Sequence, residues 1–342
     1  MSLTRLMTRA VERLPLSDSV TLAGISHLVG RTGRRMDASL GQNESVFARE
    51  MVNHAIAEHT ADANAQHYEI PAEFFSLVLG PSRKYSCCLY ENGAADLAAA
   101  EEVALAATAE HAALAEGQHI LELGCGWGSL TLWMAEHFPR ATITAVSNSR
   151  SQRAYIMGEA GRRGFGNVQV HTADMNDFRA EGRFDRVVSV EMFEHMSNWQ
   201  TLLERVTGWL KDDGRLFLHV FTHRTASYRF DRRDEADWIA QHFFTGGIMP
   251  SHSLIRCFNR LFSVEAEWRW NGGHYERTAL DWLANFDNRL PEIDLILTSV
   301  YGDDARLWRR RWRLFFLATA GLFGHGGGDQ WGVSHYRLRA AM

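Results

Sequence analysis

The stretch LELGCGWGSL, residues 121–130, places Gly124, Gly126 and Gly128 on alternate positions directly after an apolar run. Glycine permits a positive φ and lets a ligand approach the backbone closely. The residues from Ser129 onward favour a helix, whose N-terminus would add oriented N–H groups to the loop. The pattern therefore predicts a strand, a binding loop and a helix in succession.

The spacing of these glycines argues against a nicotinamide dinucleotide site. Such a site expects G-x-G-x-x-G and, about twenty residues later, an acid that binds the ribose. This sequence has G-x-G-x-G, and its second apolar run ends in Ser147 and Asn148. A glycine loop without a phosphate motif, at the start of an α/β sheet, suits S-adenosylmethionine. The alternative is a tight strand–helix turn that binds nothing.

The surrounding residues predict the sheet itself. Short apolar runs alternate with helical stretches over residues 118–223, which favours a parallel sheet flanked by helices. The alternation ends there, and residues 224–262 are rich in aromatic and charged residues. Apolar runs near 262–270 and 331–339 predict two returning strands, with helices near 278–290 and 303–323 between them.

Composition narrows the class of protein. The formal net charge of −5 gives no reason to expect a nucleic-acid partner. No apolar run approaches the ~18–20 residues of a membrane span. The cysteines match no zinc spacing and no disulfide framework, so we expect no metal site and a cytoplasmic protein. They are Cys87, Cys88, Cys125 and Cys257.

Several ordered motifs resemble those of cyclopropane-fatty-acid synthases and their methyltransferase relatives, from about His67 to the C-terminus. They are HYEIPAEFFSLVLGPSRKYSCCLYE, ELGCGWGSL, VSVEMFEHM and HYERT. Within that superfamily the sequence is most similar to coclaurine-type N-methyltransferases, through AVSNSRSQ, SCCLY, VEMFEHM, FFTGGIMPS and LFGHGGGDQW.

The resemblance implies an α/β fold of the Rossmann-like class I methyltransferase type, with a mostly parallel seven-stranded sheet and a late antiparallel strand. We expect an N-terminal helical arm (1–66) and a methyltransferase domain (67–342). That domain would comprise a core (118–223), a helical lid insertion that binds substrate (224–262) and returning strands and helices (263–342).

The resemblance also implies the residues that bind S-adenosyl-L-methionine. Its amino-acid end would meet the glycine loop and the segment before it, its ribose the end of the second strand, and its adenine the loop after the third. These residues are Tyr68, Tyr85, Ser86, Gly124, Gly126, Asn148, Gln152 and Asp174.

Glu191, Glu194 and His195 follow the fourth predicted strand and should lie at the same edge of the sheet. An alkyl amine has a pKa near ~10.4, so a methyltransferase must bind the ammonium ion and remove a proton before the nitrogen can attack. We expect Glu194 and His195 to bind and deprotonate the amine, with help from Glu191. Acids that complement a helix dipole are the alternative interpretation.

A lipid substrate is the main alternative to a small aromatic-bearing amine. In the lipid-acting relatives a bicarbonate ion is thought to act as the base, held by residues that match Cys87, Glu194, His219 and Tyr275. All four are present, which favours methylation or cyclopropanation of an unsaturated acyl chain. Glu191 favours the amine, because lipid-acting relatives typically have glycine there.

The same sequence bears on partners and on the walls of the site. The arginine-rich first 40 residues are compatible with peripheral membrane contact, and the apolar face of LWRRRWRLFFLATAGLF with a homodimer or with the core. Aromatic residues of the lid and the next strand would roof the site, or simply join the core. They are Trp238, Phe243, Phe244, Trp268 and Trp270.

Overall fold

The computed structural model describes residues 16–38, 44–58, 70–230 and 238–341. In this part of the chain a seven-stranded sheet has the order β3-β2-β1-β4-β5-β9-β8. The first five strands are parallel, and β9 pairs antiparallel with both β5 and β8. The prediction of a mostly parallel sheet with a late antiparallel strand is confirmed. The strands are β1 (His119–Leu123), β2 (Thr142–Ser147), β3 (Val168–Thr172), β4 (Phe184–Val190), β5 (Leu210–His223), β8 (Phe262–Asn271) and β9 (Trp331–Ala340).

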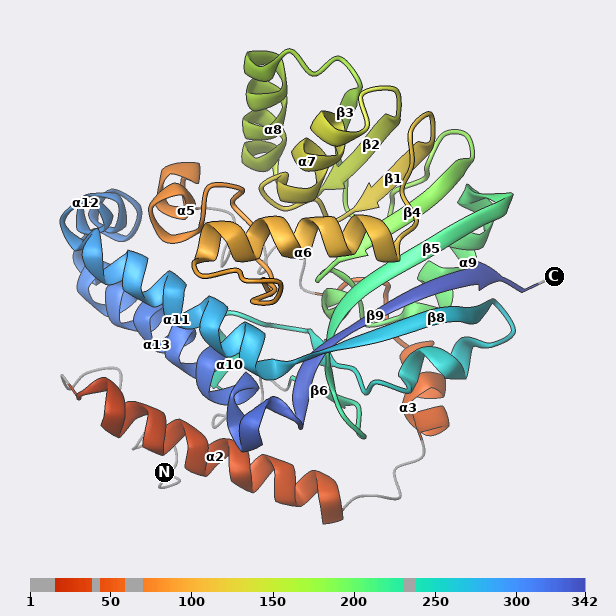
Figure 1. The fold of residues 1–342 in the computed structure, drawn as a ribbon. Helices are drawn as coiled ribbons and strands as arrows, with labels where there is room; N and C mark the ends of the chain where they lie inside the picture. Colours follow the sequence, from red (N-terminus) through yellow and green to blue (C-terminus); the bar gives the residue numbers. More distant parts are fainter. Residues whose placement is uncertain (1–15, 39–43, 59–69, 231–237, 342) are drawn as a thin grey trace.

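Both faces of the sheet are buried, because successive side chains of a strand point to opposite faces. Val187 and Leu216 pack into one core cluster, and Val188 and Phe217 into another. The helices α6 (Leu97–His111), α7 (Ser129–His137) and α8 (Arg150–Arg163) cover the second face, and α3 (Glu44–Met51) and α9 (Trp199–Trp209) the first. In Figure 1, α6 crosses in front of the strands and α9 lies behind them.

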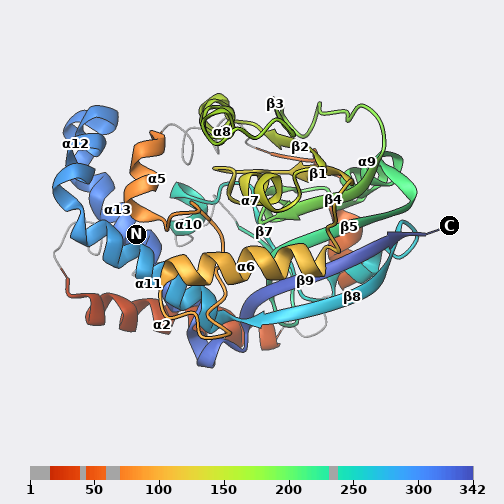
Figure 2. The ribbon, with the colours of Figure 1, turned by 45° about the horizontal axis from the view of Figure 1, so that its top comes forward.

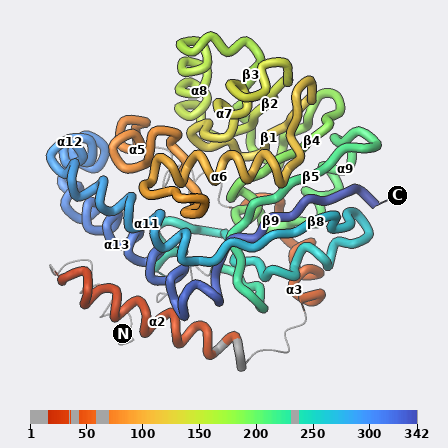
Figure 3. Tube along the Cα trace, viewed as in Figure 1, coloured from red at the N-terminus to blue at the C-terminus, as the bar shows by residue number. Residues whose placement is uncertain are grey.

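A helical layer stands beside the sheet, as Figure 1 and Figure 2 show. Its residues form a third core cluster, to which α6 also contributes. Its helices α11, α12 and α13 lie in the chain between β8 and β9, and α2 packs along α13 (Figure 3). The layer comprises α2 (Asp18–Ala38), α5 (Ala72–Val78), α11 (Gly272–Asn288), α12 (Leu290–Tyr301) and α13 (Ala305–Phe323).

This layer differs from the sequence-based expectation in one helix. We expected two helices between the last two strands, near 278–290 and 303–323, and the structure has three. The additional helix α12 begins with Pro291 in its first turn and ends at Gly302, a pairing typical of helix boundaries. None of the helices in the described ranges is long and apolar enough to cross a membrane.

The segment after β5 contains little regular structure where it is described. It has two two-residue strands, β6 (Tyr228–Arg229) and β7 (Ile248–Met249), which pair antiparallel. Between them lies the short helix α10 (Trp238–His242), and the 3-10 helix η2 (Leu254–Phe258) follows. These elements connect β5 to β8 of the same sheet.

Candidate active site

The glycine loop joins β1 to α7 with three left-handed backbones. The φ angles are +79° at Gly124, +51° at Gly126 and +80° at Gly128. A Cβ at Gly124 would lie 2.6 Å from the Met192 side chain, and one at Gly128 2.6 Å from Ile156. A Cβ at Gly126 would meet no protein atom within 4 Å. Gly124 and Gly126 line a cavity of about 240 Å³, so the loop leaves its backbone open to a ligand there.

Most of the predicted cofactor residues gather around this cavity. Gln152 is buried and its Oε1 accepts a hydrogen bond of 2.6 Å from Ser147 Oγ, while Asp174 Oδ1 accepts from the Asn176 backbone N–H at 2.8 Å. Tyr68 lies outside the described residues. The predicted residues that line the cavity are Tyr85, Ser86, Gly124, Gly126, Asn148, Gln152 and Asp174.

The segment that carries Tyr85 and Ser86 is fixed by a buried carboxylate of α6. Glu101 accepts hydrogen bonds from the backbone N–H groups of Ser82 at 2.8 Å and Lys84 at 3.1 Å. The Lys84 ammonium group is itself buried, and it donates to Ser86 Oγ and, at 2.7 Å, to the carbonyl oxygen of Cys87. This positively charged side chain therefore lies in the wall of the cavity.

Glu191 stands at the centre of the predicted catalytic set. Its Oε1 accepts a hydrogen bond of 2.9 Å from the Cys87 backbone N–H and lies 3.2 Å from His219 Nε2. Its Oε2 accepts one of 2.6 Å from the Tyr275 hydroxyl group. Burial raises the pKa of Glu191, and the charge of Lys84 and these donors oppose that rise. The Cys87 N–H and the Tyr275 hydroxyl group favour the ionised carboxylate, whereas burial favours the protonated form, so this carboxyl group can hold or release a proton.

Cys87 contributes its backbone to this arrangement rather than its thiol. The Cys87 thiol is fully buried and lies 3.3 Å from the carbonyl oxygen of Cys88. Burial, together with the nearby Glu191 charge, raises the pKa of this thiol well above its ordinary value, so it remains protonated. A thiolate nucleophile or base is therefore not available at Cys87.

The structure separates Glu194 from His195, although they are neighbours in the 3-10 helix η1 (Phe193–His195). His195 lines the cavity, and its ring lies against Phe244 with 4.2 Å between centroids. Glu194 is fully buried and outside the cavity lining, and its Oε1 accepts from the Phe221 backbone N–H at 2.6 Å. Burial and the Glu191 charge raise the pKa of Glu194 well above its usual range.

The apolar wall of the cavity comes mainly from the helical layer and from β5. Of the aromatic residues expected to roof the site, Phe244 alone contributes to the lining. Phe243 stacks on Phe315 within a core cluster, in line with the alternative that these side chains join the core, and Trp268 lies on β8 outside the lining. Aromatic side chains that do line the cavity are Tyr85, Trp127, Phe221, Phe230, Phe244, Tyr275, Trp282, Phe315 and Phe323.

Four acidic or basic residues at the cavity were not expected from the sequence, and Arg83 is one of them. Glu58 and Lys84 line it, as does Glu122 on β1. Glu122 is buried and accepts a hydrogen bond of 2.5 Å from Thr131 Oγ1, and burial raises the pKa of Glu122 to about 7. The sequence did carry a signal for Glu122, because it is an acid between apolar residues of a predicted central strand.

Known proteins share both the sequence and the fold. The family model for mycolic acid cyclopropane synthetase matches residues 56–331. The (S)-coclaurine N-methyltransferase of Thalictrum flavum subsp. glaucum is 34% identical over 285 residues, which cover 82% of this chain and 79% of that enzyme. The (S)-coclaurine N-methyltransferase of Papaver somniferum is 35% identical over 272 residues, 78% of each chain.

A solved structure shows the same likeness. Coclaurine N-methyltransferase, bound to N-methylheliamine and SAH, matches with a TM-score of 0.90 and 31% identity, covering 97% of this chain and 98% of that chain. The glycine loop, the cavity beside it and these matches agree. The chain is a methyltransferase that uses S-adenosylmethionine, and it belongs to the mycolic acid cyclopropane synthetase family.

Proposed function

We propose that this enzyme transfers the methyl group of S-adenosylmethionine to the nitrogen of a small aromatic-bearing amine. The observation that carries the proposal is the Glu191 carboxyl group, which contacts Cys87, His219 and Tyr275 at a cavity that many aromatic side chains line. A buried carboxylate is costly unless a cation pairs with it, and an ammonium ion is such a cation. The aromatic side chains of the cavity can pack against the aromatic part of the same amine.

Two titratable groups of the cavity lining, Glu191 and His195, have separate roles in this proposal. Glu191 binds the ammonium form of the substrate, and His195 removes its proton so that the nitrogen lone pair can attack the methyl group. The expected order of importance therefore changes: Glu191 replaces Glu194 as the residue that binds the amine. Glu194 instead positions β5 through its bond to the Phe221 backbone N–H.

The backbone at Glu191 supports a functional reason for its side chain. Its φ is +47°, in the left-handed region that glycine adopts without strain. A non-glycine residue held there costs of the order of ~1–3 kcal/mol. The lipid-acting relatives typically have glycine at this position. A chain that keeps a strained glutamate where glycine would fit gains something from the carboxyl group.

The same group bears on the proposed use of bicarbonate. The resemblance assigned bicarbonate to residues matching Cys87, Glu194, His219 and Tyr275. Three of these, Cys87, His219 and Tyr275, lie within hydrogen-bond distance of the Glu191 carboxyl group instead. A side-chain carboxylate therefore takes the donors that a bicarbonate ion would need, and these residues do not fit a separate bicarbonate. We propose no bicarbonate requirement for this enzyme.

The cavity residues on the side of the glycine loop support a proposal for how the cofactor binds. We propose that Ser86, Gly124 and Gly126 meet its amino-acid end, with the Glu122 carboxylate near its ammonium group. Asn148 and Gln152 then bind the ribose at the end of β2, and Asp174 lies near the adenine. This arrangement leaves the aromatic part of the cavity, beyond Glu191 and His195, for the methyl acceptor.

The test is a competition assay with S-adenosylmethionine labelled in its methyl group. Purified enzyme receives coclaurine, phenethylamines and tryptamines together with vesicles of unsaturated phospholipid, with and without bicarbonate. Label in N-methyl products, unaffected by bicarbonate, is the expected result. Label in the lipid fraction that increases with bicarbonate would overturn the proposal in favour of a lipid substrate.

A further inference from the structure

Three histidines continue from Glu191 to the edge of the molecule. His219 Nε2 lies 3.2 Å from Glu191 Oε1, and His219 Nδ1 lies 2.8 Å from His335 Nε2. His335 Nδ1 lies 2.7 Å from His111 Nδ1. His219 and His335 are fully buried, whereas His111 is partly exposed at the end of α6 and stacks on Trp268 with 3.9 Å between ring centroids.

The strand register brings these rings together. His219 on β5 lies directly opposite His335 on β9, and His335 lies opposite Trp268 on β8. Directly opposed residues of antiparallel strands have Cβ atoms ~4.5–5.5 Å apart on one face, so their side chains meet. Helix α6 crosses this face beside β9, and its last residue supplies the third ring (Figure 2).

The chain admits two arrangements of protons. Burial lowers the pKa of both His219 and His335 well below the ordinary histidine value, so each ring is neutral and carries one N–H. Each contact then needs one donor and one acceptor, which forces every N–H to point the same way. In one arrangement the donors point toward an ionised Glu191, and in the other a protonated Glu191 donates and the His111 Nε2–H faces outward.

We propose that Glu191, His219, His335 and His111 form a proton relay that exchanges one proton between the Glu191 carboxyl group and solvent. This inference rests on the proposed function, since a cationic substrate is what drives the exchange. When the ammonium ion binds, Glu191 must lose its proton to pair with it. The ligand then fills the cavity, and the histidine chain offers an exit on the other side of Glu191.

The transfer balances along the chain. The Glu191 O–H bond breaks as His219 Nε2–H forms, and His219 Nδ1–H breaks as His335 Nε2–H forms. His335 Nδ1–H breaks as His111 Nδ1–H forms, and His111 Nε2 gives its proton to water. When the methylated ammonium product leaves, the same steps run inward and reprotonate Glu191. One outward and one inward transfer per turnover restore every ring.

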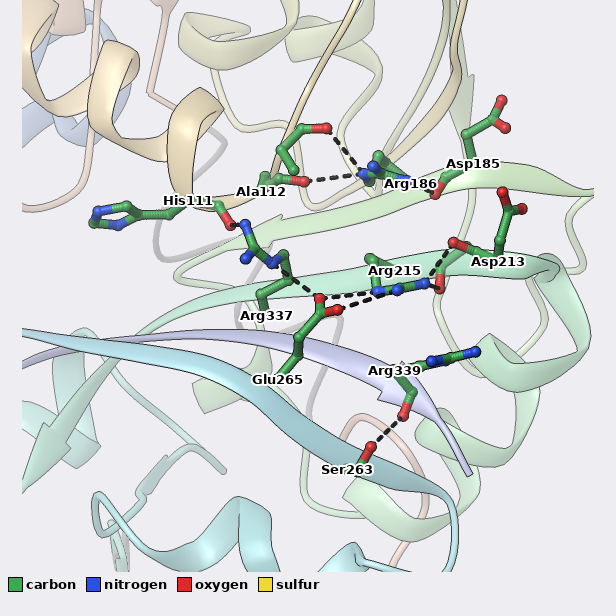
Figure 4. A network of polar contacts seen from close by, with 12 residues as sticks. His111, Ala112, Asp185, Arg186, Asp213, Arg215, Ser263, Glu265, Arg337 and Arg339 are labelled. Carbon is green, nitrogen blue, oxygen red and sulfur yellow. Dashed lines mark hydrogen bonds and ion pairs between the residues drawn. The ribbon is translucent and has the colours of Figure 1, made fainter. Parts of the chain in front are cut away.

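The charged groups around the chain favour neutral rings throughout. The Lys84 ammonium disfavours charge on His219 and His335, and Arg337 does so at His111, where Glu110 opposes it. Figure 4 shows the outer end, where Arg337 donates at 3.3 Å to the His111 carbonyl oxygen and bonds Glu265. Around Glu191 the titratable groups are Lys84, Cys87, Glu194, His195 and Tyr275.

The test follows proton release after a permanently charged ligand binds. The probe is the trimethylammonium derivative of phenethylamine, which carries no N–H proton of its own. The full-length enzyme is mixed with it in weak buffer containing a pH indicator, in a stopped-flow instrument, at several pH values around neutrality. Calorimetry measures binding separately. The variants are His111→Ala and His111→Gln, since glutamine retains bulk beside Trp268 but cannot take up a proton.

His137 provides a matched control. It ends α7 as His111 ends α6, and it stacks on Trp133 with 3.8 Å between ring centroids. His137 does not belong to the hydrogen-bonded chain of the relay. Its Nδ1 instead contacts the Trp133 carbonyl oxygen. His137→Ala therefore removes a histidine–tryptophan stack at a helix end without interrupting the relay.

The wild-type enzyme and His137→Ala should release a proton as fast as the ligand binds. Both His111 variants should still bind the ligand but release the proton roughly 10²-fold more slowly. This factor is the lower end of what a positioned proton-transfer group contributes. Free imidazole should restore the rate in His111→Ala, which has room for it. Equal release rates in wild type and both variants, with binding intact, would overturn the relay alone. A ligand that fails to bind the wild type would overturn the proposed function and the relay with it.

Discussion

The Tyr275 hydroxyl group donates a hydrogen bond of 2.6 Å to Oε2 of Glu191, joining α11 of the helical layer to the end of β4. Burial and the Glu191 charge raise the pKa of Tyr275 well above its ordinary value, so the phenol remains a donor. The wall of the cavity thus combines residues from two layers of the fold.

Replacing Glu191 by glycine should convert the site rather than unfold it. At φ +47°, Glu191→Gly removes backbone strain, and Glu191→Ala should be less stable than the glycine variant by ~1 kcal/mol. Both variants should lose amine methylation. The vacated donors of Cys87, His219 and Tyr275 should let bicarbonate restore part of the activity of Glu191→Gly. Thermal melts and assays with added bicarbonate check both statements, and a bicarbonate-indifferent variant would contradict the second.

Removing the Tyr275 hydroxyl group should change the pH dependence of activity. The hydroxyl donates to the ionised form of Glu191 and so lowers its pKa. In Tyr275→Phe that pKa rises. As the pH is lowered, Glu191 therefore becomes protonated, and activity is lost, at a higher pH than in the wild type. A hydrogen bond to a charged group contributes ~1.5–3 kcal/mol, so the acid limb should move upward by about 1–2 units. Profiles of kcat/KM against pH for both enzymes measure the shift. An unmoved acid limb would contradict the assignment.

The parts of the site that follow from local chemistry were predictable from the sequence. Gly124 and Gly126 belong to a loop whose conformation glycine alone adopts easily, so their spacing indicates their role. Helices join the parallel strands β1 to β5 except between β3 and β4, and the strand ends meet at one edge for topological reasons. Helix α12 was missed although Pro291 and Gly302 mark both of its ends.

The roles of Glu191 and Glu194 could not be separated by sequence. The two acids are three residues apart, and the left-handed backbone at Glu191 decides which one faces the cavity. That conformation depends on contacts from Cys87 and Tyr275, which lie 104 and 84 residues away along the chain. His335, 116 residues from its partner His219, gave no signal for the same reason.

His195 should affect turnover, while Glu194 should affect stability. Loss of a positioned base lowers kcat by ~10²-fold or more, and we expect this of His195→Ala. Glu194→Gln keeps an oxygen for the Phe221 N–H and should retain near-wild-type kcat. Glu194→Ala leaves that buried donor without its partner and should cost ~1–3 kcal/mol of folding free energy. Kinetics and chemical denaturation of the three variants check this, and a large kcat loss in Glu194→Gln would return the amine-binding role to Glu194.

Two alanine substitutions in the glycine loop should separate binding from stability. A Cβ at Gly126 meets no protein atom within 4 Å and extends the lining of the cavity, so Gly126→Ala should chiefly weaken binding of S-adenosylmethionine. A Cβ at Gly128 would lie 2.6 Å from Ile156, so Gly128→Ala should chiefly lower the melting temperature. Calorimetric titration with the cofactor and thermal melts give the two readouts. Equal losses of affinity in both variants would contradict the distinction.

Glu122 should make the ligand-free enzyme less stable as the pH rises through neutrality. Its pKa in the folded protein is about 7, above the ordinary value of 4.5, so folding favours the protonated carboxyl group. The penalty of an ionised Glu122 is absent below pH 4.5, grows between 4.5 and 7, and is complete above that window. The rise of the Glu122 pKa from 4.5 to about 7 corresponds to about 3 kcal/mol of folding free energy once the group is ionised. Glu122→Gln keeps an acceptor for Thr131 and cannot ionise.

The free energy of unfolding of Glu122→Gln should therefore exceed that of the wild type above neutral pH and match it near pH 4.5. The same variant should bind S-adenosylmethionine more weakly, because the carboxylate that would face the cofactor's ammonium group is gone. Urea denaturation across the pH range and cofactor titration measure the two effects. Stability curves that run parallel at every pH would show that Glu122 does not titrate in this window, and its buried charge would then need a partner other than Thr131.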